Sequence, residues 1–228
     1  MGTLVPLTAA DGFSFSAYVA QPAGQPRGGL VVLQEIFGVN RHIREVADGY
    51  AAEGYYVVAP STFHRVRADV ELGYSESDMA EGMALKAAVE ALPAPGVLAD
   101  VQAAVCHAAQ GGKVGIVGYC WGGLLTWRSA CLLEGLSAAV PYYGGGMTGE
   151  AEAARQPRVP TMAHFAEQDR WIPLDSVAAF GRAHPELTLH LYPAHHGFNC
   201  DHRAAWNAEA AALARQRTLA FLAQHLGG

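Results

Sequence analysis

The sequence predicts an α/β fold in which helices cover both faces of a mostly parallel, twisted sheet. Short, continuous apolar runs such as Leu30–Leu33 are typical of strands buried on both faces of a parallel sheet. These runs alternate along the chain with helix-length segments, which is the pattern of βαβ units. The chain has 228 residues, is 51% hydrophobic and 16% charged, and contains no polar linker, so we expect one domain over residues 1–228.

Apolar runs, helix-capping residues and Gly or Pro residues that end helices predict the strands and helices along the chain. The first segment predicts a β-hairpin, because Thr3–Thr8 and Phe13–Ala20 flank the turn pair Asp11-Gly12. Further strands are expected at Leu30–Leu33, Tyr55–Ala59, Val114–Val117, Ala138–Tyr143, Thr161–Ala166 and Thr188–Tyr192. Helices are expected from Asn40 to about Glu53, Ser77 or Asp78 to Leu92, Val97 to Ala109, Trp121 to Leu133, Leu174 to Ala183 and Arg203 to Leu226.

Charge and composition exclude several classes of protein. The 15 Lys and Arg against 21 Asp and Glu give a net charge of −6 at pH 7, so we expect no nucleic-acid partner. The N-terminal segment lacks the pattern of a secretory signal, and the apolar runs 51–59 and 113–127 are too short to span a bilayer. We therefore expect a cytoplasmic protein with a small-molecule substrate and no membrane partner. The oligomeric state stays open.

One of the four cysteines lies in a reactive context. Cys120 stands in Gly118-Tyr119-Cys120-Trp121-Gly122-Gly123, directly after the strand Val114–Val117 and at the start of a helix. This is the nucleophile-elbow pattern with Cys in place of Ser, and the glycines allow a tight strand-to-helix turn. The alternative is a buried structural cysteine. No C-x-x-C pair occurs, so no disulfide framework is expected, and Cys106 and Cys131 are expected in the core.

An acid and a base are expected downstream of the nucleophile. In hydrolases of this architecture the chain order is nucleophile, acid, histidine. Asp169 follows the strand Thr161–Ala166, and His195-His196 follows the last strand, where sites gather in open α/β sheets. Only one of the two histidines can face Cys120, and we choose His196. The alternatives are a solvated loop carboxylate for Asp169 and an exposed loop position for the other histidine.

Taken together, these segments resemble those of a known family. Gln34-Glu35-Ile36-Phe37-Gly38-Val39-Asn40, the cysteine elbow, Asp169–Pro173 and His196-Gly197-Phe198 resemble the dienelactone hydrolase family (carboxymethylenebutenolidases) of the α/β-hydrolase fold. The resemblance extends from about Ser14 to Leu226. It implies a hydrolase with a triad of Cys120, Asp169 and His196.

The resemblance also implies roles around the triad. Glu35 resembles the family's glutamate beside the nucleophile, which helps control ionisation of the thiol; the alternative is a solvated carboxylate at a strand end. The amides of Ile36 and Trp121 would form the oxyanion hole, an arrangement that acyl transfer needs. Independently of the resemblance, the candidates for the pocket wall are aromatic: Phe37, Phe63, Trp121, Tyr142 and Tyr143. The alternative for each of them is a place in the core. No cofactor and no metal is expected.

The sequence departs from the family at its carboxylate-binding arginines. The family carries an arginine four residues past the catalytic histidine, where this chain has Cys200. Arg203 lies further on and is a candidate substitute. No arginine occurs around Ser75–Leu85, where a second one is expected, although Arg65 and Arg67 lie nearby. We therefore expect only a weak preference for substrates that carry a carboxylate.

The sequence thus predicts cleavage of an ester or lactone bond by a Cys-His-Asp triad. Two other classes of protein are alternatives. A non-catalytic or ligand-sensing protein of the same fold would not need the complete triad. A metal-binding protein is suggested by a run of possible ligands, namely His195, His196, Cys200, Asp201 and His202. Their spacing matches no established zinc pattern, and the elbow would be left without a role.

Overall fold

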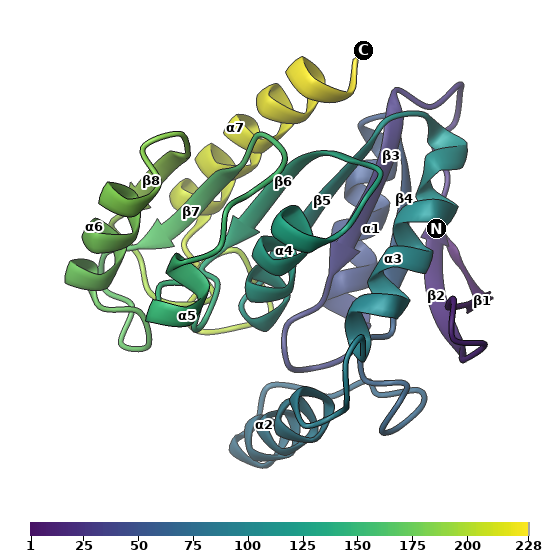
Figure 1. Ribbon diagram of the computed structural model, residues 1–228, viewed down its shortest axis with the longest axis horizontal. Coiled ribbons are helices and arrows are strands. Elements are labelled where there is room, and N and C mark those ends of the chain that lie inside the picture. Colours follow the sequence, from purple (N-terminus) through teal and green to yellow (C-terminus); the bar gives the residue numbers. More distant parts are fainter. Residues whose placement is uncertain (228) are drawn as a thin grey trace.

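The computed structural model describes residues 1–227, and in this part of the chain all eight strands form one sheet (Figure 1). Along the sheet the strand order is β1-β2-β4-β3-β5-β6-β7-β8. The strands are β1 (Thr3–Thr8), β2 (Ser14–Ala20), β3 (Gly28–Leu33), β4 (Tyr55–Pro60), β5 (Val114–Tyr119), β6 (Leu136–Tyr142), β7 (Met162–Ala166) and β8 (Thr188–Tyr192). Only β1 and β2 pair in the antiparallel sense, with each other and, for β2, with β4. The mostly parallel sheet is therefore confirmed.

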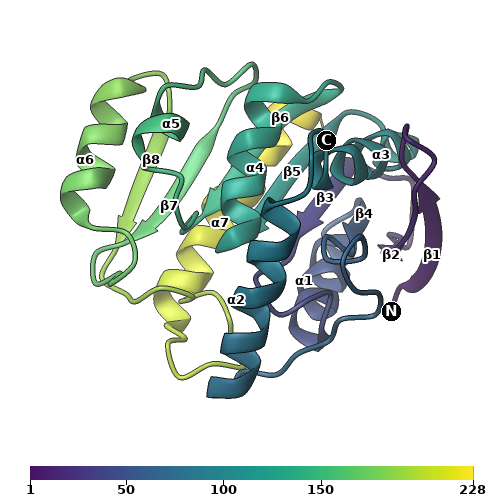
Figure 2. The same cartoon turned by 60° about the horizontal axis from the view of Figure 1, so that its bottom comes forward.

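Helices cover both faces of this sheet (Figures 1 and 2). They are α1 (Arg41–Ala52), α2 (Glu76–Glu90), α3 (Val97–Ala108), α4 (Trp121–Leu132), α5 (Glu150–Ala153), α6 (Leu174–Ala183) and α7 (Ala208–Leu226). On one face α7 meets α1, where Arg215 Nη2 donates to Gly49 O at 3.0 Å. On the other face α4 meets α6, where the rings of Trp127 and Phe180 are 5.1 Å apart. The expected layers are confirmed.

The three central strands explain the apolar runs of the sequence. All six residues of β3, of β4 and of β5 are buried, because helices close both sides of the sheet there. A strand of this kind gains stability from the apolar area removed from water on each face. The carboxyl ends of these strands meet at one edge, and α2 lies beyond that edge (Figure 2).

Two helix starts differ from the expectation. Helix α2 is capped by Ser75, not by Ser77 or Asp78: Asp78 N donates to Ser75 Oγ at 3.2 Å, and Ser75 N donates to Asp78 Oδ2 at 3.0 Å. This reciprocal capping box places Asp78 inside the first turn. Helix α7 begins after Asn207, whose Oδ1 accepts from Ala210 N at 3.0 Å, and not at Arg203. Arg203 is therefore part of the preceding loop.

The turn between β5 and α4 depends on two glycines. Cys120 at its apex has a φ of +55°, a left-handed conformation that is rare for any residue other than glycine. A Cβ on Gly118 would lie 2.2 Å from Gly122 O, and a Cβ on Gly122 would lie 2.4 Å from Gln34 O. Only glycine fits at these contacts, so the tight turn that the elbow pattern predicts is present.

The helices were compared with the length and hydropathy of membrane-spanning helices. In residues 1–227, every helix falls short of the length or the apolar character that crossing a bilayer requires.

The elbow packing gives a first prediction. Gly122→Ala should lower the free energy of unfolding by about 2 kcal/mol or more, because the new methyl group would push against main-chain oxygens that cannot move freely. The measurement is guanidinium denaturation of the purified protein. Gly24→Ala is the matched control: no atom lies within 4 Å of its Cβ position, so its stability should change by less than about 1 kcal/mol. Equal stabilities of the two variants would contradict the prediction.

Candidate active site

A cavity of about 290 Å³ lies at the carboxyl edge of the sheet, and α2 forms part of its wall. It is lined by Ile36, Phe37, Met79, Met83, Lys86, Cys120, Trp121, Gly145, Gly146, Trp171, His196 and Arg203. The structure thus brings residues from the loops after β3, β5, β6, β7 and β8, from α2 and from the start of α4 to the same place. Most of the lining is apolar, with a thiol, an imidazole and two cationic side chains among it.

The main chain of Cys120 is held from several sides. Cys120 N donates to Tyr142 O at 3.0 Å, and Cys120 O accepts from Gly123 N at 2.9 Å and from Gly145 N at 3.3 Å. These bonds stabilise a backbone conformation that would otherwise be unfavourable. The side chain stays half-buried at the head of α4, where the helix dipole favours a negatively charged sulfur.

The other cysteines lie elsewhere. Cys131 is buried in α4, as expected, and burial raises the pKa of its thiol to about 11. The expectation that Cys106 lies in the core is wrong, because Cys106 is exposed on α3. The buried stripe of that helix includes Val101, Ala104 and Val105, and position 106 falls outside it.

Asp169 and His196 form a buried pair. His196 Nδ1 donates to Asp169 Oδ2 at 2.6 Å, and the side chain of Asp169 is 1% exposed. The second carboxylate oxygen, Oδ1, accepts from Trp171 N at 2.8 Å and from Ile172 N at 3.2 Å. Both oxygens are therefore engaged, which fixes the plane of the imidazole ring and directs its other nitrogen to the cavity.

The charge state of His196 follows from its neighbours. Burial opposes the charged imidazole, but the negative charge of Cys120 and the hydrogen bond to Asp169 outweigh it and raise the pKa of His196 to about 10. The raised pKa favours a protonated imidazole on His196, next to Cys120, at neutral pH. His195, in contrast, is exposed, and its Nδ1 hydrogen-bonds to Gln168 O at 3.1 Å away from the cavity.

A second buried ion pair lies on the other side of the cavity. The side chain of Glu35 is 2% exposed, and Arg203 Nη1 donates to Glu35 Oε1 at 3.2 Å. The guanidinium also stacks near Phe37, at 5.4 Å from the ring centre. Glu35 is therefore not a solvated carboxylate. Cys200 is buried outside the cavity lining, and burial raises the pKa of its thiol to about 12, so it offers no charge to a substrate.

The aromatic wall differs in part from the expectation. Phe37 lines the cavity, whereas Tyr142 lies in the core, where its hydroxyl bonds to Thr218 Oγ1 at 2.6 Å. The side chain of the last strand residue points away from the site because neighbouring residues on a strand face opposite ways. The next residue, Tyr143, stands beside His196, with ring centres 5.1 Å apart.

Sequence reasoning missed the contribution of α2 and of the acid loop. Met79, Met83 and Lys86 lie at i, i+4 and i+7, so they share one face of α2, and this face meets the cavity. The spacing was present in the sequence, but nothing in it tells a cavity-facing stripe from a core-facing one. Trp171, two residues past Asp169, also lines the cavity and is largely exposed.

Arg65 and Arg67 are engaged away from the cavity. Arg65 donates to both oxygens of Asp100, at 2.8 and 2.7 Å, and Asp100 is fully buried. It also contacts Asp11. Arg67 pairs with Glu81 on the surface. Neither arginine is among the cavity residues, so neither is available to a substrate there.

Comparisons with known proteins identify the family and the fold of the chain. Residues 15–226 match the model of the dienelactone hydrolase family. The chain is 35% identical over 223 residues to a carboxymethylenebutenolidase of Pseudomonas putida, covering 93% of this chain and 92% of the relative. Its structure is similar to that of a candidate dienelactone hydrolase from Klebsiella pneumoniae, with a TM-score of 0.84, 30% identity and 99% of each chain covered.

A more distant structure shares the fold. It is a dienelactone hydrolase-like promiscuous phosphotriesterase from metagenomic libraries, with a TM-score of 0.73 at 21% identity and 99% of each chain covered. Together with the closer likeness, this confirms the α/β-hydrolase fold expected from the sequence.

The buried pair of Arg65 gives a second prediction. Arg65→Ala should lower the free energy of unfolding by about 3–5 kcal/mol, because the carboxylate of Asp100 would stay buried without its partner. Arg67→Ala is the matched control, since its pair is exposed and should contribute about 1 kcal/mol or less. Chemical denaturation measures both. The prediction fails if Arg65→Ala is as stable as Arg67→Ala.

Proposed function

Because the chain belongs to the dienelactone hydrolase family, we propose that it cleaves an ester or lactone bond with Cys120 as nucleophile, His196 as acid–base and Asp169 as the group that orients His196. The family makes the chain a hydrolase of the carboxymethylenebutenolidase type. One observation carries the assignment of residues: Cys120 and His196 open into the same cavity, and Asp169 is locked behind His196 at 2.6 Å.

The proposed reaction proceeds through a thioester. The Cys120 sulfur attacks the carbonyl carbon, and the carbonyl π electrons move to oxygen. When the tetrahedral intermediate collapses, the bond to the leaving oxygen breaks and that oxygen takes the Nε2 proton of His196. Water then attacks the thioester while His196 accepts a proton from it, and the thiolate is released with the acid product.

The oxyanion needs donors, which we assign to the main-chain amides of Ile36 and Trp121. Both residues line the cavity beside Cys120. Trp121 opens α4, so its amide is one of the free donors at a helix start. Two such donors, fixed before the substrate binds, stabilise charge that develops only in the transition state.

Glu35 is proposed to control ionisation of the nucleophile. Burial raises the pKa of Tyr143 well above its ordinary value, and the charges of Glu35 and Cys120 add to this effect. Glu35 and Cys120 therefore both act on the same buried side chain. A buried carboxylate so placed disfavours a second negative charge on Cys120, and Arg203 balances it in part.

The walls indicate the kind of substrate. Phe37, Met79, Met83 and Trp171 supply an apolar lining that suits an aromatic or unsaturated acyl group of moderate size. The two cations at the cavity are already paired: Arg203 with Glu35 at 3.2 Å, and Lys86 with Glu90 at 3.0 Å.

The triad assignment is tested by substitution. Cys120→Ala should abolish hydrolysis of an activated aryl ester, and His196→Ala should lower kcat/KM by at least about 10²-fold because acid–base catalysis is lost. Asp169→Asn should have an intermediate effect. The matched controls are Cys131→Ala and His195→Ala, which should keep most of the activity.

Alkylation tests the same assignment independently. Iodoacetamide should inactivate the enzyme in step with labelling of Cys120, measured by peptide mapping. Cys106→Ala removes the exposed cysteine that the reagent also reaches, and this variant should be inactivated at the same rate. Near wild-type activity of Cys120→Ala would contradict the assignment while leaving the family untouched.

Charge pairing in the cavity gives a prediction about specificity. A lactone that carries a carboxylate should be preferred over its methyl ester by about tenfold or less in kcat/KM. The reason is that both cationic side chains among the cavity residues already have an acidic partner. Steady-state kinetics on the two substrates measures the ratio. A ratio above about a thousand would mean that Arg203 or Lys86 leaves its partner to bind the substrate.

A further inference from the structure

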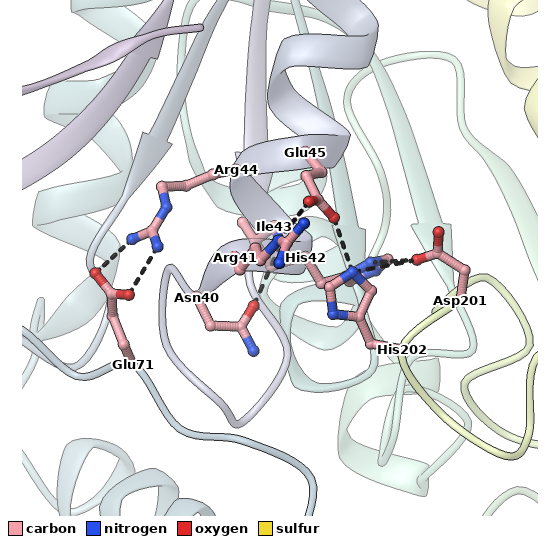
Figure 3. A network of polar contacts seen from close by, with 9 residues as sticks. All are labelled: Asn40, Arg41, His42, Ile43, Arg44, Glu45, Glu71, Asp201 and His202. Atoms are coloured by element: carbon pink, nitrogen blue, oxygen red, sulfur yellow. Dashed lines mark hydrogen bonds and ion pairs between the residues drawn. The ribbon is translucent and has the colours of Figure 1, made fainter.

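A second cluster of ligand-type side chains lies outside the cavity, between the start of α1 and the loop that follows His196. We propose that His42, Asp201 and His202 form a binding site for a divalent transition-metal ion such as Zn²⁺. Figure 3 shows the three side chains directed toward one another, with Glu45 beside them. The proposal does not depend on the triad or on the substrate.

The distances fit a metal site. His42 Nδ1 and Asp201 Oδ1 are 3.2 Å apart, and His202 Nε2 is 3.8 Å from the same oxygen. In residues 1–227 this is the one group of three His, Cys, Asp or Glu side chains whose ligand atoms all lie within 4.8 Å of one another. Ligands of a tetrahedral ion with bonds of about 2.0–2.1 Å lie roughly 3.3 Å apart. The two separations that involve Asp201 Oδ1 are thus within about 0.5 Å of the spacing that such an ion needs.

The donor types select the class of metal. Two imidazole nitrogens and one carboxylate suit Zn²⁺ and its neighbours, whereas Mg²⁺ and Ca²⁺ prefer oxygen ligands throughout. His42 is buried and gives the site a fixed wall, while Asp201 and His202 are exposed and leave an open approach for the ion. A water molecule or Glu45 would complete the coordination. Glu45 Oε2 is already 2.8 Å from His202 Nε2.

Nearby charges permit a cation. The start of α1 carries a partial positive charge, and Arg41 adds a full one. Arg41 is neutralised, however, because its Nε donates to Glu45 Oε1 at 2.7 Å. The carboxylate of Asp201 offsets the helix end. The balance at the site is therefore favourable to a divalent ion.

The site would link two segments that also shape the cavity. His42 follows the loop that carries Glu35 and Ile36, and Asp201 and His202 lie between His196 and Arg203 in sequence. A bound ion would therefore restrain the positions of both loops. Binding to the folded state alone raises stability, so the ion should raise the melting temperature.

The test is titration of chelator-treated protein with ZnCl₂ by calorimetry, together with thermal unfolding. The wild-type protein should bind one equivalent, and saturating zinc should raise Tm by about 5 °C or more. His202→Gln and Asp201→Asn should each weaken binding at least about tenfold. Both side chains are exposed, so neither change endangers folding. MgCl₂ should leave Tm unchanged.

Two control variants separate this site from other zinc ligands. Cys120→Ala removes the thiol of the cavity, and His195→Gln removes an exposed loop histidine outside the cluster; both should bind zinc as the wild type does. The proposal is overturned if the wild type takes up no zinc, if His202→Gln and Asp201→Asn bind it unchanged, or if Cys120→Ala abolishes binding.

Discussion

The close approach of main chain to main chain at the start of α4 is the constraint on which the rest of the site depends. A Cβ on Gly122 would lie 2.4 Å from Gln34 O, and a Cβ on Gly123 would lie 2.6 Å from Tyr142 O. These contacts press the helix start between the ends of β3 and β6. The nucleophile, the loop with the proposed oxyanion donor and the strand end next to Tyr143 are therefore held in one rigid unit, which is what preorganised catalysis requires.

Electrostatics divides the cavity into two halves. On one side, Asp169 and the sulfur of Cys120 stabilise a positive imidazole on His196. On the other, Glu35 is compensated by Arg203 at 3.2 Å. Each buried charge has a partner, as it must when water is nearly absent.

Much of the fold could be predicted from the sequence, because strands buried on two faces and glycine-rich turns leave local patterns. The same patterns brought Cys120 and His196 to one edge, and the cavity contains both. The direction in which a side chain faces, and the residue with which it pairs, were harder to predict. Tyr142 and Tyr143 are adjacent and chemically equal, yet only the local twist of the chain at a φ of +36° turns the second toward His196. The catalytic roles of Cys120 and His196 remain predictions.

Pairs of residues that are far apart in sequence could not be predicted either, because local sequence patterns do not show which segments the fold brings together. Arg203 was expected at the start of a helix, and only the stronger cap at Asn207 leaves it in a loop from which it reaches Glu35. The partner of Asp201 in the proposed metal site is His42, which is 159 positions away in sequence. Asp201 and His202 are adjacent in sequence and could be recognised as possible ligands, whereas His42 joins them only in the folded chain.

Helix α2 has a consequence for how this enzyme can diversify. Only Gly82, Leu85 and Val89 are buried in it. The helix lies outside the sheet (Figure 2), and one of its faces borders the cavity. A Cβ on Gly82 would lie 2.2 Å from Ile36 O, so this close contact sets the distance between α2 and the loop after β3. Met83 and Lys86 can therefore be exchanged at little cost to the core, whereas Met79 also packs against it. Substitutions on this one helix can therefore change the shape of the cavity while the loops that carry Cys120 and His196 keep their sequence.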